Sequence, residues 1–167
     1  MIQRMVRASS LDVSVYEEVE HDQSATMQAF QVMVLVSILA GIGQGIGSGG
    51  ISGLLLGVLG SLAGWALWSF LTYMIGTRIF SGTATYGELL RTIGFANAPG
   101  VFLIFSFIPL IGGLIVITVA IWTLISGVLA VRQALDISTV NAIITCGIGW
   151  LVKFIIFLII GFFAFIF

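Results

Sequence analysis

The residues of this sequence that could perform chemistry gather in a short acidic run near the N-terminus. The run YEEVEHD contains Glu17, Glu18 and His21, which share one face of a helix because residues three and four positions apart are neighbours. These side chains could be proposed as metal ligands. Structural zinc sites need four nitrogen or sulfur ligands, and the chain has one histidine and one cysteine. We therefore predict a solvated acidic face, able to recruit a basic soluble partner, with no metal ion and no cofactor.

The other polar residues do not form a catalytic or nucleotide-binding pattern. A nucleophilic side chain needs a base nearby, and the only histidine, His21, lies outside the apolar part of the chain. The glycine-rich stretch GIGQGIGSGG lacks the Lys-Ser/Thr pair and the preceding strand of a phosphate-binding loop. Cys146 lies in an apolar run and is interpreted as an inert small hydrophobe. We predict no enzymatic activity, no catalytic residue and no nucleic-acid partner.

Lys153 is the sharpest candidate for a functional charge, because it interrupts the last apolar run. A lysine at the bilayer centre costs about 2.5–3.5 kcal/mol on insertion scales, so it usually faces a partner or a cavity. If the last span comprises residues 148–167, Lys153 lies only about 7–8 Å from the cytoplasmic edge at 1.5 Å per residue. From there it can snorkel to the headgroups, which is the favoured interpretation. Pairing with Glu88 and a role in transport stay open as alternatives.

The elements that position these residues are predicted to be membrane-spanning helices. Of the 167 residues, 59% are hydrophobic and 8% are charged, whereas a soluble domain carries about 25% charge. A spanning helix needs about 20 apolar residues. We predict an all-α, polytopic membrane bundle of about five transmembrane helices, in which an amphipathic segment (1–24) at the cytoplasmic membrane surface precedes the transmembrane domain (25–167). The expected spans are about 28–45, 51–75, 92–108, 112–131 and 139–167.

The arginines indicate how the spans are threaded. If the spans alternate, all five arginines fall on one side of the membrane, namely Arg4, Arg7, Arg78, Arg91 and Arg132. The opposite loops, near Ser48 and Leu110, contain no lysine or arginine. By the positive-inside rule the N-terminus is cytoplasmic and Phe167 lies outside. An even number of spans would destroy this bias, which therefore supports five. The charged first 25 residues also lack an apolar h-region, so no cleavable signal peptide is expected.

The second span carries small residues at four-residue spacing. One stripe contains Gly49, Gly53, Gly57 and Ser61, with Gly60 and Gly64 beside it. Small residues at this spacing let helix backbones approach closely in membranes. The stripe predicts a helix-packing surface, on a neighbouring helix of the same chain or on a second protomer. Packing within the chain is the favoured alternative.

The stretch TYGELLRTIGFANAPG places charges and helix breakers between two apolar runs. Glu88 and Arg91 stand three apart, so they can pair on a helix at the headgroup level. Pro99 removes a backbone donor and can kink the helix entering the bilayer, with Asn97 near enough to satisfy a freed group. We interpret the stretch as an interface and a bent span, in preference to a ligand site.

This stretch and the segments after it resemble the Yip1-domain family of multi-pass membrane proteins. The sequence continues with IPLIGG, AIW and AVRQALDISTVNA, and the family has a Gly-Glu-Leu-type entry, two Pro turns, a Trp and an arginine-bearing loop in this order. The resemblance covers nearly the whole chain. The matching positions are Gly87, Glu88, Arg91, Phe95, Ala96, Pro99, Pro109, Gly112, Trp122, Arg132 and Ala142.

The resemblance implies five transmembrane helices, a cytosolic N-terminus and no enzymatic activity. Eukaryotic members of the family are associated with Rab GTPases and vesicle traffic, but this chain has no long cytosolic N-terminal domain and no Asp-Leu-x-Gly-Pro motif. It is similar to short prokaryotic members, and this resemblance implies a prokaryotic cytoplasmic membrane. We expect a structural or interaction component of the bilayer with a membrane-protein partner or a homo-oligomer, such as an accessory subunit. The alternative is a small-solute or lipid transporter or channel.

Overall fold

Helices make up nearly all of the described chain. The structure is a computed structural model that describes the backbone of residues 1–45 and 50–166, and the side chains of these residues except positions 157 and 159–166. No strand occurs within these ranges, and the predicted all-α class is confirmed. The helices in chain order are α1 (Ile2–Ser9), α2 (Val13–His21), α3 (Ala25–Gly43), α4 (Gly50–Ile79), α5 (Tyr86–Ala96), the 3-10 helix η1 (Ala98–Phe107), α6 (Gly112–Leu135) and α7 (Thr139–Ile166).

Five helical segments within the described ranges are long and apolar enough to cross a membrane, as predicted. The third comprises α5 and η1, and it begins at Tyr86, six residues before the position expected from the apolar run. Its early start has a local cause, because Thr85 and Glu88 form a capping box at the N-terminus of α5. The five segments are Ala25–Gly43, Gly50–Ile79, Tyr86–Phe107, Gly112–Leu135 and Thr139–Ile156.

The third segment is bent at its middle. The α-helix ends at Ala96, and η1 starts at Ala98 with Pro99 in its first turn. Asn97 Nδ2 donates a hydrogen bond of 2.8 Å to the carbonyl of Ile93, so a side chain satisfies an acceptor at the end of α5. This arrangement confirms both the predicted bend at Pro99 and the predicted role of Asn97.

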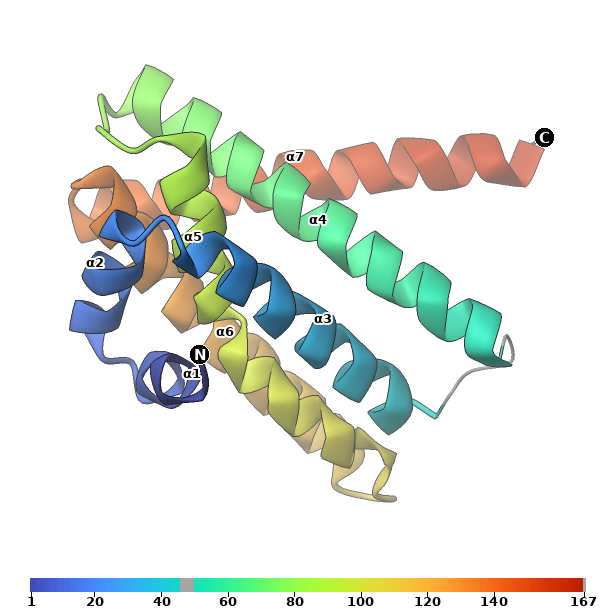
Figure 1. The fold of residues 1–167 in the computed structure, drawn as a ribbon. Coiled ribbons are helices and arrows are strands. Elements are labelled where there is room, and N and C mark those ends of the chain that lie inside the picture. Colours follow the sequence, from blue (N-terminus) through green and yellow to red (C-terminus); the bar gives the residue numbers. More distant parts are fainter. Residues whose placement is uncertain (46–49, 167) are drawn as a thin grey trace.

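This bent segment is also the centre of the bundle. Its most apolar window is 56% buried, against 17% to 33% for the other four segments, so it is the one that the others surround. α3 and α6 pack along η1, and α3, α4 and α6 pack along α5 (Figure 1). The large side chains Leu89, Ile93 and Phe95 of α5 are fully buried in this core.

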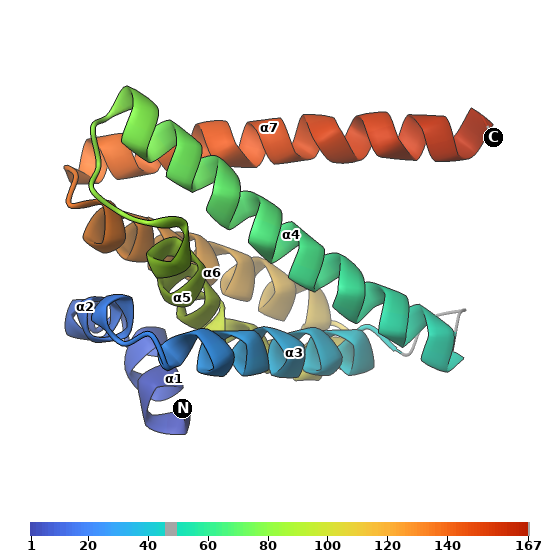
Figure 2. The same cartoon turned by 45° about the horizontal axis from the view of Figure 1, so that its top comes forward.

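α4 and α7 lie partly outside this core. They pack against each other at the end of the molecule that holds the C-terminus of α4 and the N-terminus of α7. From there the two helices diverge, as both views show (Figures 1 and 2). The first half of α4 is consequently separated from α7.

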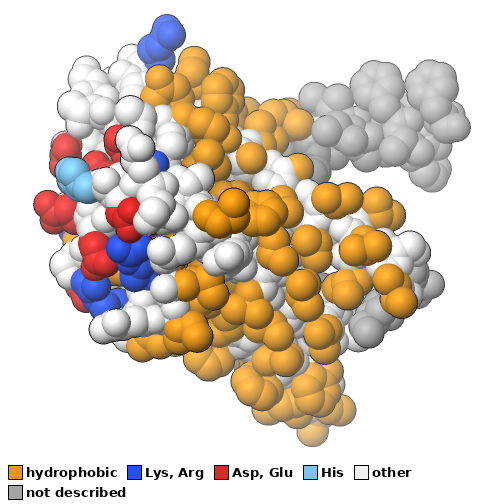
Figure 3. Space-filling view, in the orientation of Figure 1, with side chains coloured by type: hydrophobic (Ala, Val, Ile, Leu, Met, Phe, Trp, Pro, Cys, Tyr) orange, Lys and Arg blue, Asp and Glu red, His pale blue; other side chains and the backbone are white. Residues whose placement is uncertain are grey.

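The N-terminal helices α1 and α2 pack against one end of the bundle. Val15, Tyr16 and Val19 of α2 are fully buried, because α5 and α6 cover that face of the helix. On α1, Ile2 and Val6 remain 73% and 60% exposed, so this helix presents apolar side chains outward. Charged side chains gather at the same end of the molecule, and apolar side chains dominate the remaining surface of the view (Figure 3). We refer to α1, α2 and their charged side chains as the cap.

Candidate functional site

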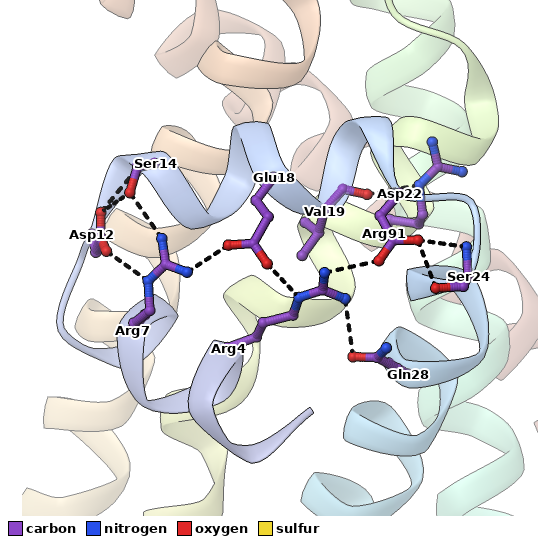
Figure 4. A network of polar contacts seen from close by, with 10 residues as sticks. All are labelled: Arg4, Arg7, Asp12, Ser14, Glu18, Val19, Asp22, Ser24, Gln28 and Arg91. Atoms are coloured by element: carbon purple, nitrogen blue, oxygen red, sulfur yellow. Dashed lines mark hydrogen bonds and ion pairs between the residues drawn. The ribbon is translucent and has the colours of Figure 1, made fainter.

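Glu18 of α2, with Asp12 and Asp22 at the two ends of that helix, forms ion pairs with arginines of α1 (Figure 4). Arg4 Nε lies 2.8 Å from Glu18 Oε1, and Arg4 Nη2 lies 2.8 Å from Asp22 Oδ2. Arg7 Nε lies 2.9 Å from Asp12 Oδ2, and the same guanidinium also contacts Glu18. Hydrogen bonds from Arg7 and Arg4 lower the pKa of Glu18. The network joins α1 to α2 and holds the two helices together.

The proposed metal ligands of the acidic run are not brought together as a metal site. Glu18 is taken up by the two arginines. His21 Nδ1 lies 2.9 Å from the backbone oxygen of Glu17, within the same helix. Among residues 1–45 and 50–166, no group of three or more His, Cys, Asp or Glu side chains is placed to hold a metal ion.

Arg91 fastens the cap to the bundle, and the predicted Glu88–Arg91 pair is wrong. Arg91 is 7% exposed, its Nε donates a 2.9 Å hydrogen bond to the carbonyl of Val19, and its Nη2 donates to that of Glu20. The last carbonyls of a helix have no partner within the helix, so those of α2 bind the guanidinium. Glu88 Oε2 accepts from the backbone N–H of Thr85 at 2.8 Å. Glu88 therefore caps the start of α5 and Arg91 binds the end of α2, and the two side chains do not pair with each other.

The remaining positions of the resemblance also lie where elements meet. Trp122 Nε1 donates a 2.8 Å hydrogen bond to the carbonyl of Ser9, which joins α6 to α1. A Cβ at Gly112 would lie 2.1 Å from the Ser106 carbonyl oxygen, so only glycine fits where α6 leaves the turn after Pro109.

Two further positions of the resemblance also lie at contacts that hold the fold together. A Cβ at Gly87 would lie 3.2 Å from Arg91 Nη1, so this glycine leaves room for the guanidinium. Arg132 Nη1 lies 3.4 Å from Thr139 Oγ1, which links the end of α6 to the start of α7. These residues assemble the fold and do not line an open site.

The glycine stripe of α4 has no helix of the described chain packed on it. A Cβ built on Gly53, Gly57, Gly60 or Gly64 would have no atom within 4 Å. The favoured packing within the chain is therefore wrong for these four glycines, because α4 diverges from α7 along this half (Figure 2). Gly49 lies outside the described residues.

The stripe forms one wall of a groove between α3, α4 and α7. Its volume is about 470 Å³, and four of its lining residues carry polar side chains, namely Ser37, Ser61, Asn97 and Lys153. The bend at Asn97 brings the third span into the groove. The apolar and small lining residues are Met33, Val36, Ala40, Gly57, Gly60, Gly64, Trp65, Trp68 and Leu103.

Lys153 reaches this groove from α7 and has no acidic partner there. Its Nζ lies 5.8 Å from the centroid of the Trp68 ring, a distance at which an ammonium is attracted to the ring face. Within residues 1–45 and 50–166, the ion pairs are those of Arg4 and Arg7 in the cap. The alternative pairing with Glu88 is consequently wrong.

Lys153 lies near the middle of α7. The helix begins at Thr139, as the predicted span 139–167 does, and Lys153 lies fourteen residues, or about 21 Å, along it. Gly64, which also lines the groove, is fourteen residues from the start of α4 and fifteen from its end. Snorkelling of the ammonium to the headgroups stays a prediction.

Comparison with known proteins identifies the family. The family model of the Yip1 domain matches residues 13–161. This chain belongs to the Yip1-domain family. The match runs from α2 to near the end of α7. All the residues that line the groove therefore belong to the Yip1 domain. No curated protein matches this sequence. No solved structure matches it either.

Several residues of the cap and groove could not be chosen from the sequence. The Yip1-domain resemblance marked Arg91 and Pro99 but gave no sign that Arg91 binds α2. Trp68 was indistinguishable from an apolar filler, since nothing local links it to Lys153 85 positions later. Asn97 did carry a signal, because an amide beside a proline in an apolar run indicates a break at membrane depth.

Proposed function

We propose that this Yip1-domain protein is a non-enzymatic component of the membrane that holds a partner membrane protein along the groove, as an accessory subunit does. The observation that carries the proposal is the uncovered face of α4, where a Cβ on any of the four described stripe glycines meets no atom within 4 Å. In a bilayer, helices associate through close backbone approach at small residues. A face of this kind in the middle of a span is suited to a second helix.

The distribution of titratable groups supports a role without catalysis. General acid–base chemistry needs a group whose pKa lies near the working pH beside the reacting atoms. The single histidine, His21, is exposed in the cap and bonded to its own helix. Lys153 in the groove stands beside Trp68, and the described residues that line the groove include no carboxylate.

We further propose that the protein resides in the cytoplasmic membrane of a prokaryote with the cap in the cytoplasm. The support is the position of the cap arginines at one end of the bundle (Figure 3), together with the positive-inside rule. Three acidic residues at the same end, Asp12, Glu18 and Asp22, are engaged with Arg4 and Arg7, so the cap is suited to sealing that end of the bundle.

A site-specific photo-crosslink tests the proposed function in native membranes. The crosslinking residue replaces Gly53, one turn from the groove on the open face of α4. The matched control replaces Ile117, which is 59% exposed on α6 and outside the groove. We expect a discrete protein adduct from position 53 and none from position 117. Adducts with lipid alone at both positions would contradict the proposal.

A small-solute or lipid transporter is the second candidate, favoured by the polar side chains that meet near the middle of the spans. Ser37, Ser61, Asn97 and Lys153 line one groove from four different elements. Reconstitution into liposomes decides between the two functions. A flux of anionic solute or labelled lipid that Lys153→Met abolishes would establish transport, whereas holding a partner requires no flux.

A further inference from the structure

The proposed function does not specify the chemistry of the partner helix. The residues of the groove indicate which kind of helix fits. We infer that the occupant is a transmembrane helix of another protein that carries an aspartate or glutamate near the middle of its span, placed to pair with Lys153. This inference rests on the proposed function. It follows from the charge of the groove, its depth and the shape of its α4 wall.

The charge requires a carboxylate that this chain does not supply. Among the described residues that line the groove, Lys153 is the one cation, and none of them is acidic. An ammonium near the bilayer centre is costly unless it is paired. All seven acidic residues of the chain lie in the cap or at a helix end on its side of the bundle, namely Asp12, Glu17, Glu18, Glu20, Asp22, Glu88 and Asp136. A second copy of this chain therefore brings no carboxylate to this depth.

The depth distinguishes a carboxylate side chain from a lipid phosphate. Lys153 lies about 21 Å along α7 from Thr139 at 1.5 Å per residue, level with the middle of α4 and the bend at Asn97. Lipid phosphates lie at the headgroup level, about 15 Å from the centre of a hydrocarbon core of roughly 30 Å. A lipid phosphate would have to move from the headgroup level toward the centre of the bilayer to reach Lys153. An acidic side chain on a spanning helix can lie at the level of Lys153 without such a movement.

The shape of the groove suits a helix lying along α4. Gly53, Gly57 and Gly60 present bare backbone over two turns, which permits the close approach that membrane helices use for association. Trp68 holds the ammonium at 5.8 Å from its ring centroid, on the same helix as these glycines. The positive charge and the bare backbone thus face one occupant. Ser61 and Asn97 add hydrogen-bonding groups at the same level.

The test measures how the yield of the photo-crosslinked partner at position 53 depends on the charge at position 153. In native membranes that carry the crosslinking residue at position 53, the adduct is digested and the partner segment is sequenced by mass spectrometry. We expect a hydrophobic segment with a central Asp or Glu. Lys153→Met should lower the adduct yield about tenfold, as a membrane polar contact of 1–2 kcal/mol predicts. Lys153→Arg, which keeps the charge, should retain most of it. Leu151→Met, at an exposed site outside the groove lining, is the matched control.

Each other outcome overturns the inference in a distinguishable way. A partner segment without an acidic residue, or capture that Lys153→Met leaves unchanged, overturns the inference and leaves the proposed function intact. If the adduct contains an anionic lipid and does not form in the Lys153→Met variant, the anionic partner of Lys153 is a lipid phosphate. Capture of a second copy of this chain assigns the groove to a homo-oligomer. The absence of any protein adduct contradicts both proposals.

Discussion

At the scale of single residues, Arg91 makes the buried charged contact that docks the cap. Its guanidinium is buried and donates to two carbonyls at the end of α2. The ion pairs of Arg4 and Arg7 are at least partly exposed, and such pairs contribute about 0–1 kcal/mol each. The buried hydrogen bonds of Arg91 therefore outweigh the more visible surface network.

Replacing Arg91 with methionine should detach the cap. We expect a loss of about 3 kcal/mol, because hydrogen bonds to a charged group contribute about 1.5–3 kcal/mol each and α2 would keep unpaired carbonyls. The measurement is the thermal unfolding midpoint in detergent, combined with proteolysis of the segment before α3. Arg78→Met, at an exposed arginine, should leave both unchanged. Equal effects of the two substitutions would refute this role of Arg91.

Glu20 gives the cap a pH dependence of unusual sign. Burial is the largest cause that raises the pKa of Glu20 from 4.5 to about 7, with smaller raising contributions from Glu88, Asp136 and Glu17 and a lowering one from His21. Between these values the folded carboxyl holds a proton that the unfolded one has lost. The contribution of Glu20 to stability is therefore present below pH 4.5 and is lost as pH rises through about 7.

Glu20→Gln should accordingly flatten the decline in stability between about pH 5 and about pH 8. The unfolding midpoint of the detergent-solubilised protein across this range is the measurement. His21 acts in the same direction, because the carbonyl of Glu17 and the charge of Glu20 raise its pKa, so His21→Gln is measured in parallel. A wild-type midpoint that does not fall over this range would show that Glu20 does not titrate there.

At the scale of elements, two kinds of glycine have opposite roles. A Cβ at Gly94 would lie 2.7 Å from the Cβ of Ala29, so this glycine sets the close contact of α5 with α3. A Cβ at Gly53 would meet no atom within 4 Å. The first is part of the core of the bundle, and the second belongs to a face that the bundle leaves open.

The same substitution should separate these two roles. Gly94→Ala should destabilise the fold by about 1–3 kcal/mol through overpacking. Gly53→Ala should be neutral or stabilising by up to about 1 kcal/mol, because alanine favours a helix over glycine. Reversible unfolding in mixed detergent micelles compares the two. Similar losses at both positions would mean that the α4 face is packed within the chain after all.

At the scale of the whole molecule, the segregation of charge defines its two ends. The cap and the helix ends beside it hold the arginines, and the turn between η1 and α6 at the other end presents a fully exposed Leu110. Three spans separate Ser10 from Leu110, so an odd number of crossings places them on opposite sides of the membrane.

Cysteine labelling tests this threading in intact cells. With Cys146 replaced by alanine, Leu110→Cys should react with an impermeant maleimide added outside, and Ser10→Cys should react only after the cells are opened. Both positions are exposed in the structure, so failure to react reports the compartment and not burial. Labelling of both from one side would contradict the proposed orientation.

The sequence by itself determined the five spans, the bend in the third and the helical class. Each of these depends on a local property: the length of an apolar run, the missing N–H of Pro99 and the amide of Asn97 beside it. Arg91 and Lys153 were also visible from the sequence as charges that need an explanation in a chain of this composition.

The tertiary structure alone decided which groups those charges meet. Arg91 binds carbonyls some seventy positions away, and Lys153 stands beside Trp68 on a helix from the other half of the chain. Local spacing favoured Glu88 as the partner of Arg91, but the capping of α5 occupies that carboxylate. Whether a stripe of glycines is covered depends on the angle between helices, which packing of the entire core sets and no single segment encodes.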